Sequence, residues 1–466
     1  MLTLFAILVA TATISCAHAP EKTLGASEPK LGTPVVPQPP PPKLSVDAPT
    51  TIDERAQHAR ALITEVAKER GLIETKPLVI TFEDAVAFRA SLNRVADEDT
   101  SDPEKERAKW VAFGFAKPEV DPHQVALAVL DEQVAAFYDT KEKRLHIPSA
   151  PPPAANSMAA AQTDMVLAHE IEHGLQDQHY PFPDLDKQPD DDRGLALKAL
   201  YEGDATFVML AVPEARFGKV DGAQLLLAAR QLSDMPNMAL LKMSGGNSDE
   251  LAKAPKLVQN ELMLPYLGGL RLVAELYVVG GYALVNQLFE HPPLSTEQVL
   301  HPQKYIEGEP PTAVEIPKVP EGARELTHGT LGELGIRALF SDCLTDEDST
   351  QGALGWGGDS YLVAVRPDGQ LILEWSTTWD TPADATRFSA ALDRARTSGC
   401  FPTVRVSAHG NWGLDEGARV LARGANVALE RGLGDDVQRA TLEKLLKLPQ
   451  KPQRDVPPIP NVELKK

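Results

Sequence analysis

Residues 164–176 constrain the fold of this chain more than any other stretch. The segment reads Asp-Met-Val-Leu-Ala-His-Glu-Ile-Glu-His-Gly-Leu-Gln, so His169 and His173 are four positions apart. That spacing is close to one helical turn and puts both imidazoles on the same face of a helix. Both rings can then reach one metal ion, and a carboxylate between them can accept a proton from metal-bound water. We therefore expect a helix with a metal site on one face.

Spacing alone does not decide which of the two glutamates is the base. With His169 at zero on a helical wheel, His173 lies about 40° round, Glu170 about 100° and Glu172 about 300°. The glutamates are therefore symmetric about the midpoint of the two histidines. A choice between them needs information from outside the pattern.

The pentapeptide His169-Glu170-Ile171-Glu172-His173 resembles the HExxH motif of zinc metallopeptidases. The resemblance implies that His169 and His173 bind zinc. It also implies that Glu170, the residue after the first histidine, activates the zinc-bound water for hydrolysis of a peptide bond. A peptide or protein would then be the substrate.

A catalytic zinc ion usually has three protein ligands and one open position. Glu202 is the first choice for the third ligand, because it lies on a second predicted helix, 195–211, beside Ala199, Gly203 and Ala205. Small residues would let this helix approach the first one closely. The arrangement resembles the gluzincins, the thermolysin-like class in which a glutamate from a following helix completes the site.

Two other residues compete with Glu202. Asp204 is the second choice, from the same segment. His179 is the third, since it gives a metzincin-like spacing, but metzincins need a sharp helix break at a glycine and this chain has Gln176 there. An unbroken helix would carry His179 about 100° away from the metal face.

Supporting roles are less constrained by the sequence. His301, Tyr305 and Tyr266 are candidates for stabilising an oxyanion opposite the metal. Gln176 and Asp177 return towards the metal face of the helix and are candidates for orienting the histidines.

The first residues are typical of an export signal. Positions 2–15 are apolar and uncharged, and they are too short to span a bilayer as a helix. The sequence Thr13-Ile14-Ser15-Cys16 resembles a bacterial lipobox, which implies a lipid anchor on Cys16, while Ala17-His18-Ala19 is an alternative cleavage site. We expect an exported protein, in the cell envelope or outside it, with contact to a membrane only through Cys16.

Composition and proline-rich stretches predict the domain organisation. At 466 residues the chain exceeds one ordinary core. We expect a signal peptide at 1–19, a proline-rich linker at 20–50 and a zincin-like metallopeptidase domain at 51–320. An α+β accessory domain at 321–448 and a proline-rich tail at 449–466 would follow. The predicted class is α+β, with a mainly helical catalytic domain that holds a small antiparallel sheet.

Within the catalytic domain, residues 134–139 and 144–148 predict a hairpin on either side of a charged turn. In proteases that this chain resembles, such a sheet lies beside the metal helix and offers an edge to an extended peptide.

Charge and cysteine content narrow the alternatives. A net charge of −20 would repel nucleic acids and anionic membrane surfaces, so neither is an expected partner. After Cys16 only Cys343 and Cys400 remain, and they form either one disulfide or two unpaired thiols. Two other functions stay open: a zinc hydrolase of non-peptide amides, and a non-catalytic envelope lipoprotein that serves as a binding scaffold.

Overall fold

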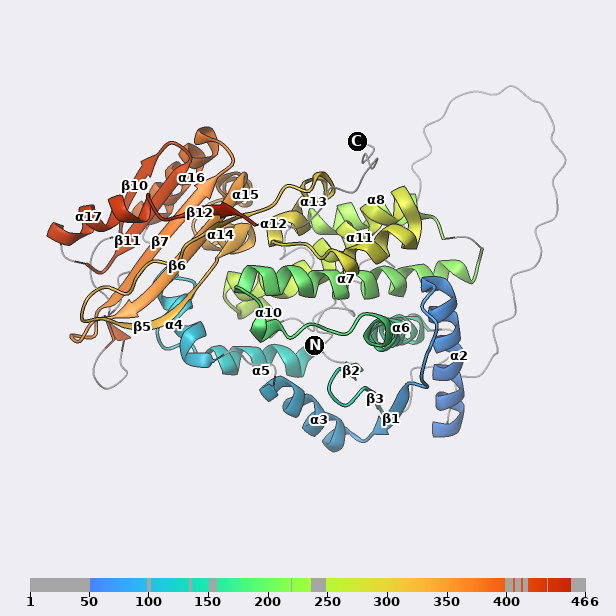
Figure 1. Cartoon of the computed structure of the whole chain (residues 1–466). Helices are drawn as coiled ribbons and strands as arrows, with labels where there is room; N and C mark the ends of the chain where they lie inside the picture. The colour runs from blue at the N-terminus through green and yellow to red at the C-terminus, as the bar shows by residue number, and fades with distance from the viewer. Residues whose placement is uncertain are drawn as a thin grey trace, which may run out of the picture.

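The computed structural model describes residues 51–98, 102–133, 136–150, 157–218, 220–235, 249–398, 405–406, 412–413, 418–433 and 435–453. Within these ranges the α+β prediction is confirmed: a helical part carries the motif, and a second part is built on an antiparallel sheet (Figure 1). The predicted signal peptide with Cys16, the 20–50 linker and Cys400 lie outside the described residues.

Helix α2 (Ile52–Arg70) begins and ends where local chemistry dictates. Thr51 and Glu54 form a capping box, in which each side chain accepts a hydrogen bond from the other's backbone N–H. Gly71 ends the helix in the left-handed conformation, with φ 77°. The last helical residue, Arg70, is only 1% exposed, so its guanidinium is directed into the protein.

A small sheet lies next to the motif helix, with the strand order β1-β3-β2. The predicted hairpin is present as β2 (Phe137–Asp139) and β3 (Arg144–Pro148), which pair antiparallel. Strand β1 (Val79–Glu83) adds to β3 in parallel, so the sheet is mixed. Strand β2 forms one edge of this sheet, and helix α6 packs against it.

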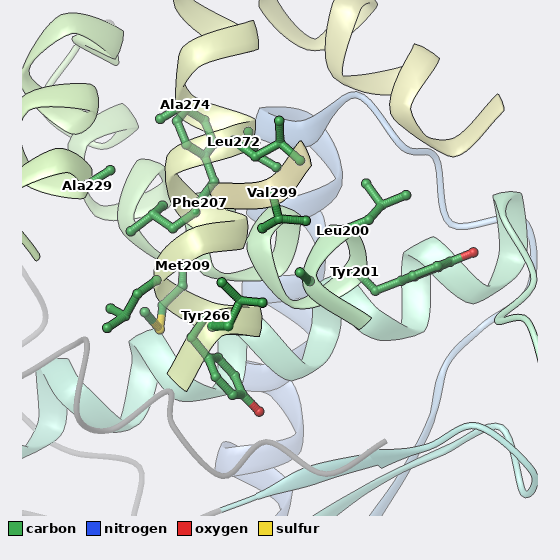
Figure 2. Close-up of a cluster of buried hydrophobic side chains, with 14 of the residues drawn as sticks. Leu200, Tyr201, Phe207, Met209, Ala229, Tyr266, Leu272, Ala274 and Val299 are labelled. Atoms are coloured by element: carbon green, nitrogen blue, oxygen red, sulfur yellow. The ribbon is translucent and has the colours of Figure 1, made fainter. Parts of the chain in front are cut away.

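The helical part is assembled around α6, α7 and α11. Its elements after α2 are η1 (Leu185–Lys187) and the helices α3 (Ala85–Glu98), α4 (Pro103–Phe113), α5 (Pro122–Gln133), α6 (Met158–His179), α7 (Asp191–Ala215), α8 (Gly222–Ser233), α10 (Asp249–Lys253), α11 (Lys256–Glu290), α12 (Thr296–Leu300) and α13 (Pro302–Glu307). Figure 1 shows α7 crossing this part, with α6 on one side and α11 on the other. Side chains of α7 and α11 form much of one continuous apolar core, which also includes Val299 and Ala229 (Figure 2).

Helix α11 is long and apolar enough to cross a membrane by length and composition. However, 72% of its most apolar window is buried inside the protein. Glu275 also forms an ion pair with Arg230 at 2.7 Å within that core. Within the described structure, these contacts make α11 a core helix.

The second part contains a five-stranded antiparallel sheet with the order β10-β11-β7-β6-β5. Its elements are β4 (Thr312–Val314), β5 (Arg324–Gly329), α14 (Gly332–Ser341), α15 (Asp346–Ala353), β6 (Trp356–Val365), β7 (Leu371–Trp379), α16 (Pro382–Thr397), β8 (Arg405–Val406), β9 (Trp412–Gly413), β10 (Arg419–Arg423), β11 (Asn426–Arg431), α17 (Asp435–Leu445) and β12 (Gln450–Pro452). Strands β6 and β7 form a hairpin, with Gly369 at φ 85° in its turn. Residues 450–452, which we predicted to be part of a tail, instead pair with β4. Cys343 is disulfide-bonded, while its predicted partner Cys400 lies outside the described residues.

Helix α4 joins the two parts. Although it lies early in the chain, its apolar residues Trp110 and Phe113 pack into the core of the second part. The Phe113 ring meets Tyr361 and Trp375 edge-on, with ring centroids 5.3 and 5.2 Å away. Arg431 of β11 also donates a hydrogen bond to a carbonyl of α4. The second core therefore includes residues from both ends of the chain.

Candidate metal centre

The two motif histidines lie on one face of α6, as the sequence predicts. The helix begins after Ser157, whose side chain accepts a hydrogen bond from the Ala160 N–H, and continues unbroken to His179. The ring centroids of His169 and His173 are 4.6 Å apart, and both side chains are buried. Helix α6 therefore presents two imidazoles side by side inside the protein.

Helix α7 brings Glu202 to these rings. Its Oε2 lies 3.0 Å from Nε2 of His169 and 3.3 Å from Nε2 of His173. One ligand atom from each of the three residues lies within 4.8 Å of the others, so one ion can contact all three. The other carboxylate oxygen of Glu202, Oε1, has no hydrogen-bond partner among the described residues. The predicted set of His169, His173 and Glu202 is thus brought together by the fold.

The small residues next to Glu202 serve a different contact from the one we predicted. A Cβ on Gly203 would lie 2.4 Å from the carbonyl oxygen of Gly269, and one on Gly269 would lie 2.1 Å from that of Ala199. These residues therefore let α7 approach α11, on the side away from α6. Because Glu202 adjoins Gly203, this close crossing fixes the position from which Glu202 reaches the histidines.

Electrostatics within the three residues keep His169 neutral and pair a charged Glu202 with His173. Burial lowers the pKa of His169 to about 4, which keeps that imidazole neutral. Burial alone would raise the pKa of Glu202, but the charge of His173 and hydrogen bonds from both histidines outweigh it, so the pKa is lowered. Burial opposes a charge on His173 too, yet the Glu202 carboxylate prevails and raises the pKa of that ring. A metal ion that binds here therefore has to displace a proton from His173.

The structure separates the two glutamates that the helical wheel left equivalent. Glu170 faces β2, where its Oε2 accepts a hydrogen bond from the backbone N–H of Tyr138 at 2.8 Å. Its Oε1 has no hydrogen-bond partner within the described ranges. Burial raises the pKa of Glu170 to about 8. Glu172 lies on the opposite side, 3.7 Å from Arg70.

Of the two residues expected to orient the histidines, one does so. Gln176 Oε1 lies 2.9 Å from Nδ1 of His173. Asp177 instead accepts hydrogen bonds from the Tyr138 hydroxyl at 2.8 Å and from Lys143 at 2.7 Å, so it holds the β2–β3 hairpin against α6.

The rival third ligands have other partners. Asp204 accepts hydrogen bonds from Arg70 Nε, at 2.8 Å to Oδ1 and 3.1 Å to Oδ2. His179 is exposed and lies 2.7 Å from the carbonyl oxygen of Ile73. Because α6 does not break at Gln176, His179 stays away from the metal face, as an unbroken helix requires.

The three residues predicted as candidates for stabilising an oxyanion also differ in their partners. The His301 ring lies 3.0 Å from a Glu333 carboxylate oxygen, and the Tyr305 hydroxyl donates to the His291 carbonyl at 2.7 Å. Tyr266, by contrast, stacks on the His169 ring with centroids 6.0 Å apart. Figure 2 shows Tyr266 extending from the edge of the apolar cluster. Of the three, Tyr266 alone lies beside a predicted ligand.

Sequence reasoning missed Arg70 and the backbone N–H of Tyr138. An arginine in the last turn of a helix is ordinary, since it complements the helix dipole, and nothing in the pattern marks it as buried. A backbone donor carries no residue signature at all. The position of β2 beside α6 is the only signal that could have indicated it.

Two other groups also have ligand-like spacing: Asp139 with Glu142 and His146, and Glu297 with Glu309 and Asp380. In each group the carboxylates already pair with a cation of the protein. Arg94 contacts Asp139 at 2.7 Å and Glu142 at 3.0 Å. Lys304 lies 2.7 Å from Glu297 and 2.6 Å from both Glu309 and Asp380. Among the groups found in the described residues, the one on α6 and α7 alone combines two imidazoles with a carboxylate.

A cavity of about 730 Å³ lies elsewhere, among α4, α5, α7, α11 and β5. Charged residues such as Lys109, Asp191 and Glu261 line it. None of the three predicted ligands does, so we base no site on this cavity.

Comparison with known proteins gives one match. Residues 319–440 match a family model described as a domain of unknown function (DUF8575). The matched residues cover most of the sheet-containing second part and none of α6 or α7. No curated protein and no solved structure matches the chain.

Proposed function

We propose that this protein is a zinc-dependent peptidase of the cell envelope, with the site formed by His169, Glu170, His173 and Glu202. The observation that carries the proposal is that two imidazoles and a carboxylate meet at one buried point. Glu202 lies 33 residues after His169 in the chain, yet its carboxylate contacts the rings of both His169 and His173. A catalytic base candidate, Glu170, lies on the same helix turn with one unpaired oxygen in the described structure.

The three residues fit zinc chemically. Two neutral nitrogen donors and one carboxylate form a ligand set used by catalytic zinc, with a fourth position left for water or substrate. Burying a carboxylate with an unpaired oxygen costs free energy unless a partner is present, and a divalent cation would supply it. Zinc bound here would lower the pKa of a water molecule and polarise a carbonyl group.

The residues of the chain would then divide the proton transfers. Glu170 accepts a proton on Oε1 as the oxygen of the water attacks the peptide carbonyl carbon. The Tyr138 N–H, bonded to Oε2, holds the carboxylate in place for this step. Glu170 returns the proton to the leaving nitrogen as the carbon–nitrogen bond breaks, so no net charge is left on the enzyme.

Metal content gives the first test. Purified wild-type protein should contain one zinc per chain, and His169→Ala should lose it. His179→Ala is the matched control, because it removes an imidazole from the same helix outside the site and should keep the metal. Absence of zinc from the wild type would favour the scaffold function.

Hydrolysis gives the second test. Glu170→Gln should keep zinc and lose cleavage of internally quenched peptides by about 10²–10⁴-fold, the usual contribution of a general base. Glu172→Gln makes the same change two residues along α6 and should have a much smaller effect. Unchanged cleavage by Glu170→Gln would contradict the assignment. A zinc protein that cleaves no peptide but hydrolyses simple amides would be the non-peptide hydrolase.

A further inference from the structure

We propose that Arg70 acts as a positioning residue which, through Asp204 and Gln176, holds the His173 ring in the tautomer that leaves Nε2 free for a metal. The inference rests on the proposed zinc site and adds a chain of three residues behind it. It gives the N-terminal helix α2 a role in a centre that α6 and α7 otherwise form.

The contacts run without a gap from α2 to the metal face. Arg70 Nε donates to both carboxylate oxygens of Asp204, at 2.8 and 3.1 Å. Gln176 Nε2 donates to Asp204 Oδ2 at 3.0 Å and to the Tyr201 carbonyl at 3.0 Å. Gln176 Oε1 lies 2.9 Å from Nδ1 of His173. All of these groups are buried, so water does not compete for the bonds.

The direction of each bond follows from what each group can donate. A carboxylate and a backbone carbonyl only accept, so Gln176 must turn its NH₂ towards Asp204 and Tyr201. Its carbonyl oxygen is then left for His173 and can only accept. Nδ1 of His173 must therefore carry a hydrogen, so Nε2, which faces Glu202, is the nitrogen through which a metal would be bound.

Arg70 holds the carboxylate that sets this order. Its Nη1 donates to Asn286 of α11 at 2.8 Å, and its guanidinium lies over the Tyr282 ring, 4.7 Å from the centroid. Anchored in this way, the guanidinium fixes the plane of Asp204, with Oδ2 directed at Gln176. Stability alone does not explain the pair, because well-packed apolar residues often replace a buried ion pair at little cost.

The two histidines consequently differ in how they are held. Nδ1 of His169 has no hydrogen-bond partner in the described part of the chain, whereas that of His173 is bonded to Gln176. The orientation of His173 depends on the chain of hydrogen bonds through Arg70, Asp204 and Gln176, which we call the relay. Disturbing the relay should therefore affect His173 and leave His169 unchanged.

The test is Arg70→Met in the full chain, with zinc affinity and the His173 tautomer as readouts. Zinc affinity is measured on folded protein by competition with a chelator, and should fall about 10–100-fold, the usual effect of losing an outer partner of a ligand. Removing a positive charge near a cation would by itself strengthen binding. Weaker binding therefore cannot come from the charge change.

The tautomer is followed through the hydrogen on His173 Nδ1, which is detected by ¹⁵N–¹H correlations in metal-free protein labelled with [¹⁵N]histidine. Wild type should show an Nδ1–H that exchanges slowly with water, and Arg70→Met should show faster exchange. Arg60→Met, on the exposed side of the same helix, is the control and should change neither readout. Gln176→Leu should match Arg70→Met, and the double variant should lose no more than either single one.

The relay is overturned if Arg70→Met lowers thermal stability but keeps both the Nδ1–H exchange rate and the zinc affinity. If the wild type binds no zinc, the proposed function fails, while the comparison of Nδ1–H exchange still decides the relay.

Discussion

Glu202 in the helical part and Asp359 in the sheet part are both buried carboxylates, yet their surroundings differ in kind. Asp359 accepts four hydrogen bonds from neutral donors: the Leu331 and Gly332 backbone N–H groups at 2.9 and 3.0 Å, and the Trp356 and Trp375 indoles at 2.9 Å each. Glu202 meets only two imidazoles with one of its oxygens, and its other oxygen has no hydrogen-bond partner among the described residues.

The difference indicates what each carboxylate is for. Asp359 is satisfied by its own domain, where it ties the start of α14 to the β6–β7 hairpin. Oε1 of Glu202 has no such partner among the described residues, and the side chains around it are of the types that could hold a metal ion. A buried charge that the fold leaves incomplete is a better sign of a binding site than burial or charge alone.

Glu202→Ala should give the largest effect and sharpen this contrast. Loss of one of three direct ligands should weaken zinc binding by more than the ~10–100-fold that an outer partner contributes. Chelator competition measures the affinity, and chemical unfolding of the metal-free protein should show a retained fold. Unchanged affinity would mean that another group completes the site, which would remove the distinction from Asp359.

Asp359→Ala tests the other buried carboxylate of this comparison, and it should lower stability without changing zinc affinity. It leaves four buried donors without an acceptor, and each unsatisfied buried donor costs about 1–3 kcal/mol, so the unfolding free energy should fall by at least about 4 kcal/mol. Zinc affinity of the folded fraction should not change. The control is Asp368→Ala, at an exposed hairpin turn. Loss of zinc binding in Asp359→Ala would contradict the conclusion that Asp359 has only a structural role.

Gly203→Ala should affect both properties at once, because it separates α7 from α11. The added methyl group would meet the Gly269 backbone, and overpacking of this kind costs about 1–3 kcal/mol. Zinc affinity should fall together with stability, since Glu202 moves with its helix. Gly194→Ala on the same helix is the control, because its Cβ would lie 3.9 Å from its nearest neighbour, the Leu185 carbonyl oxygen. If Gly203→Ala lowers stability but leaves zinc affinity unchanged, the close crossing of α7 and α11 does not set the position of Glu202.

A third carboxylate gives the smallest expected effect. Burial raises the pKa of Glu430 to about 8, with a further contribution from its cross-strand neighbour Glu374. Folded Glu430 therefore holds its proton when the unfolded chain has released it, so wild-type stability should fall as pH rises from about 4.5 to 8. Glu430→Gln should be the more stable form at pH 9 by about 1–2 kcal/mol and no more stable at pH 4, as measured by urea unfolding. A difference that does not depend on pH would contradict this explanation.

The sequence predicted the elements of the site better than their contacts. Local rules located the helix that carries the motif and the β2–β3 hairpin, because helical spacing and turns depend on neighbouring residues. The choice of Glu202 over His179 followed from helix continuity at Gln176, which is also a local property. These predictions needed no knowledge of how distant segments pack.

Other features depend on contacts between distant segments, which cannot be recognised from the pattern of a single sequence. The wheel could not separate Glu170 from Glu172, because the answer depends on β2 on one side of α6 and Arg70 on the other. The small residues around Glu202 were assigned to the wrong neighbour for the same reason. That α4 belongs to the core of the second part was also not predicted, since its apolar pattern does not show which surface it covers.

The placement of α4 has a consequence for how this protein can be made. Arg431 reaches back 319 residues to the carbonyl of Ala112, so the second core closes only after nearly the whole polypeptide exists. Until then Trp110 and Phe113 have no partner surface, and the early helices are vulnerable to aggregation. A truncated product that stops after α7 would leave this apolar face exposed, because its partner surface belongs to the second part.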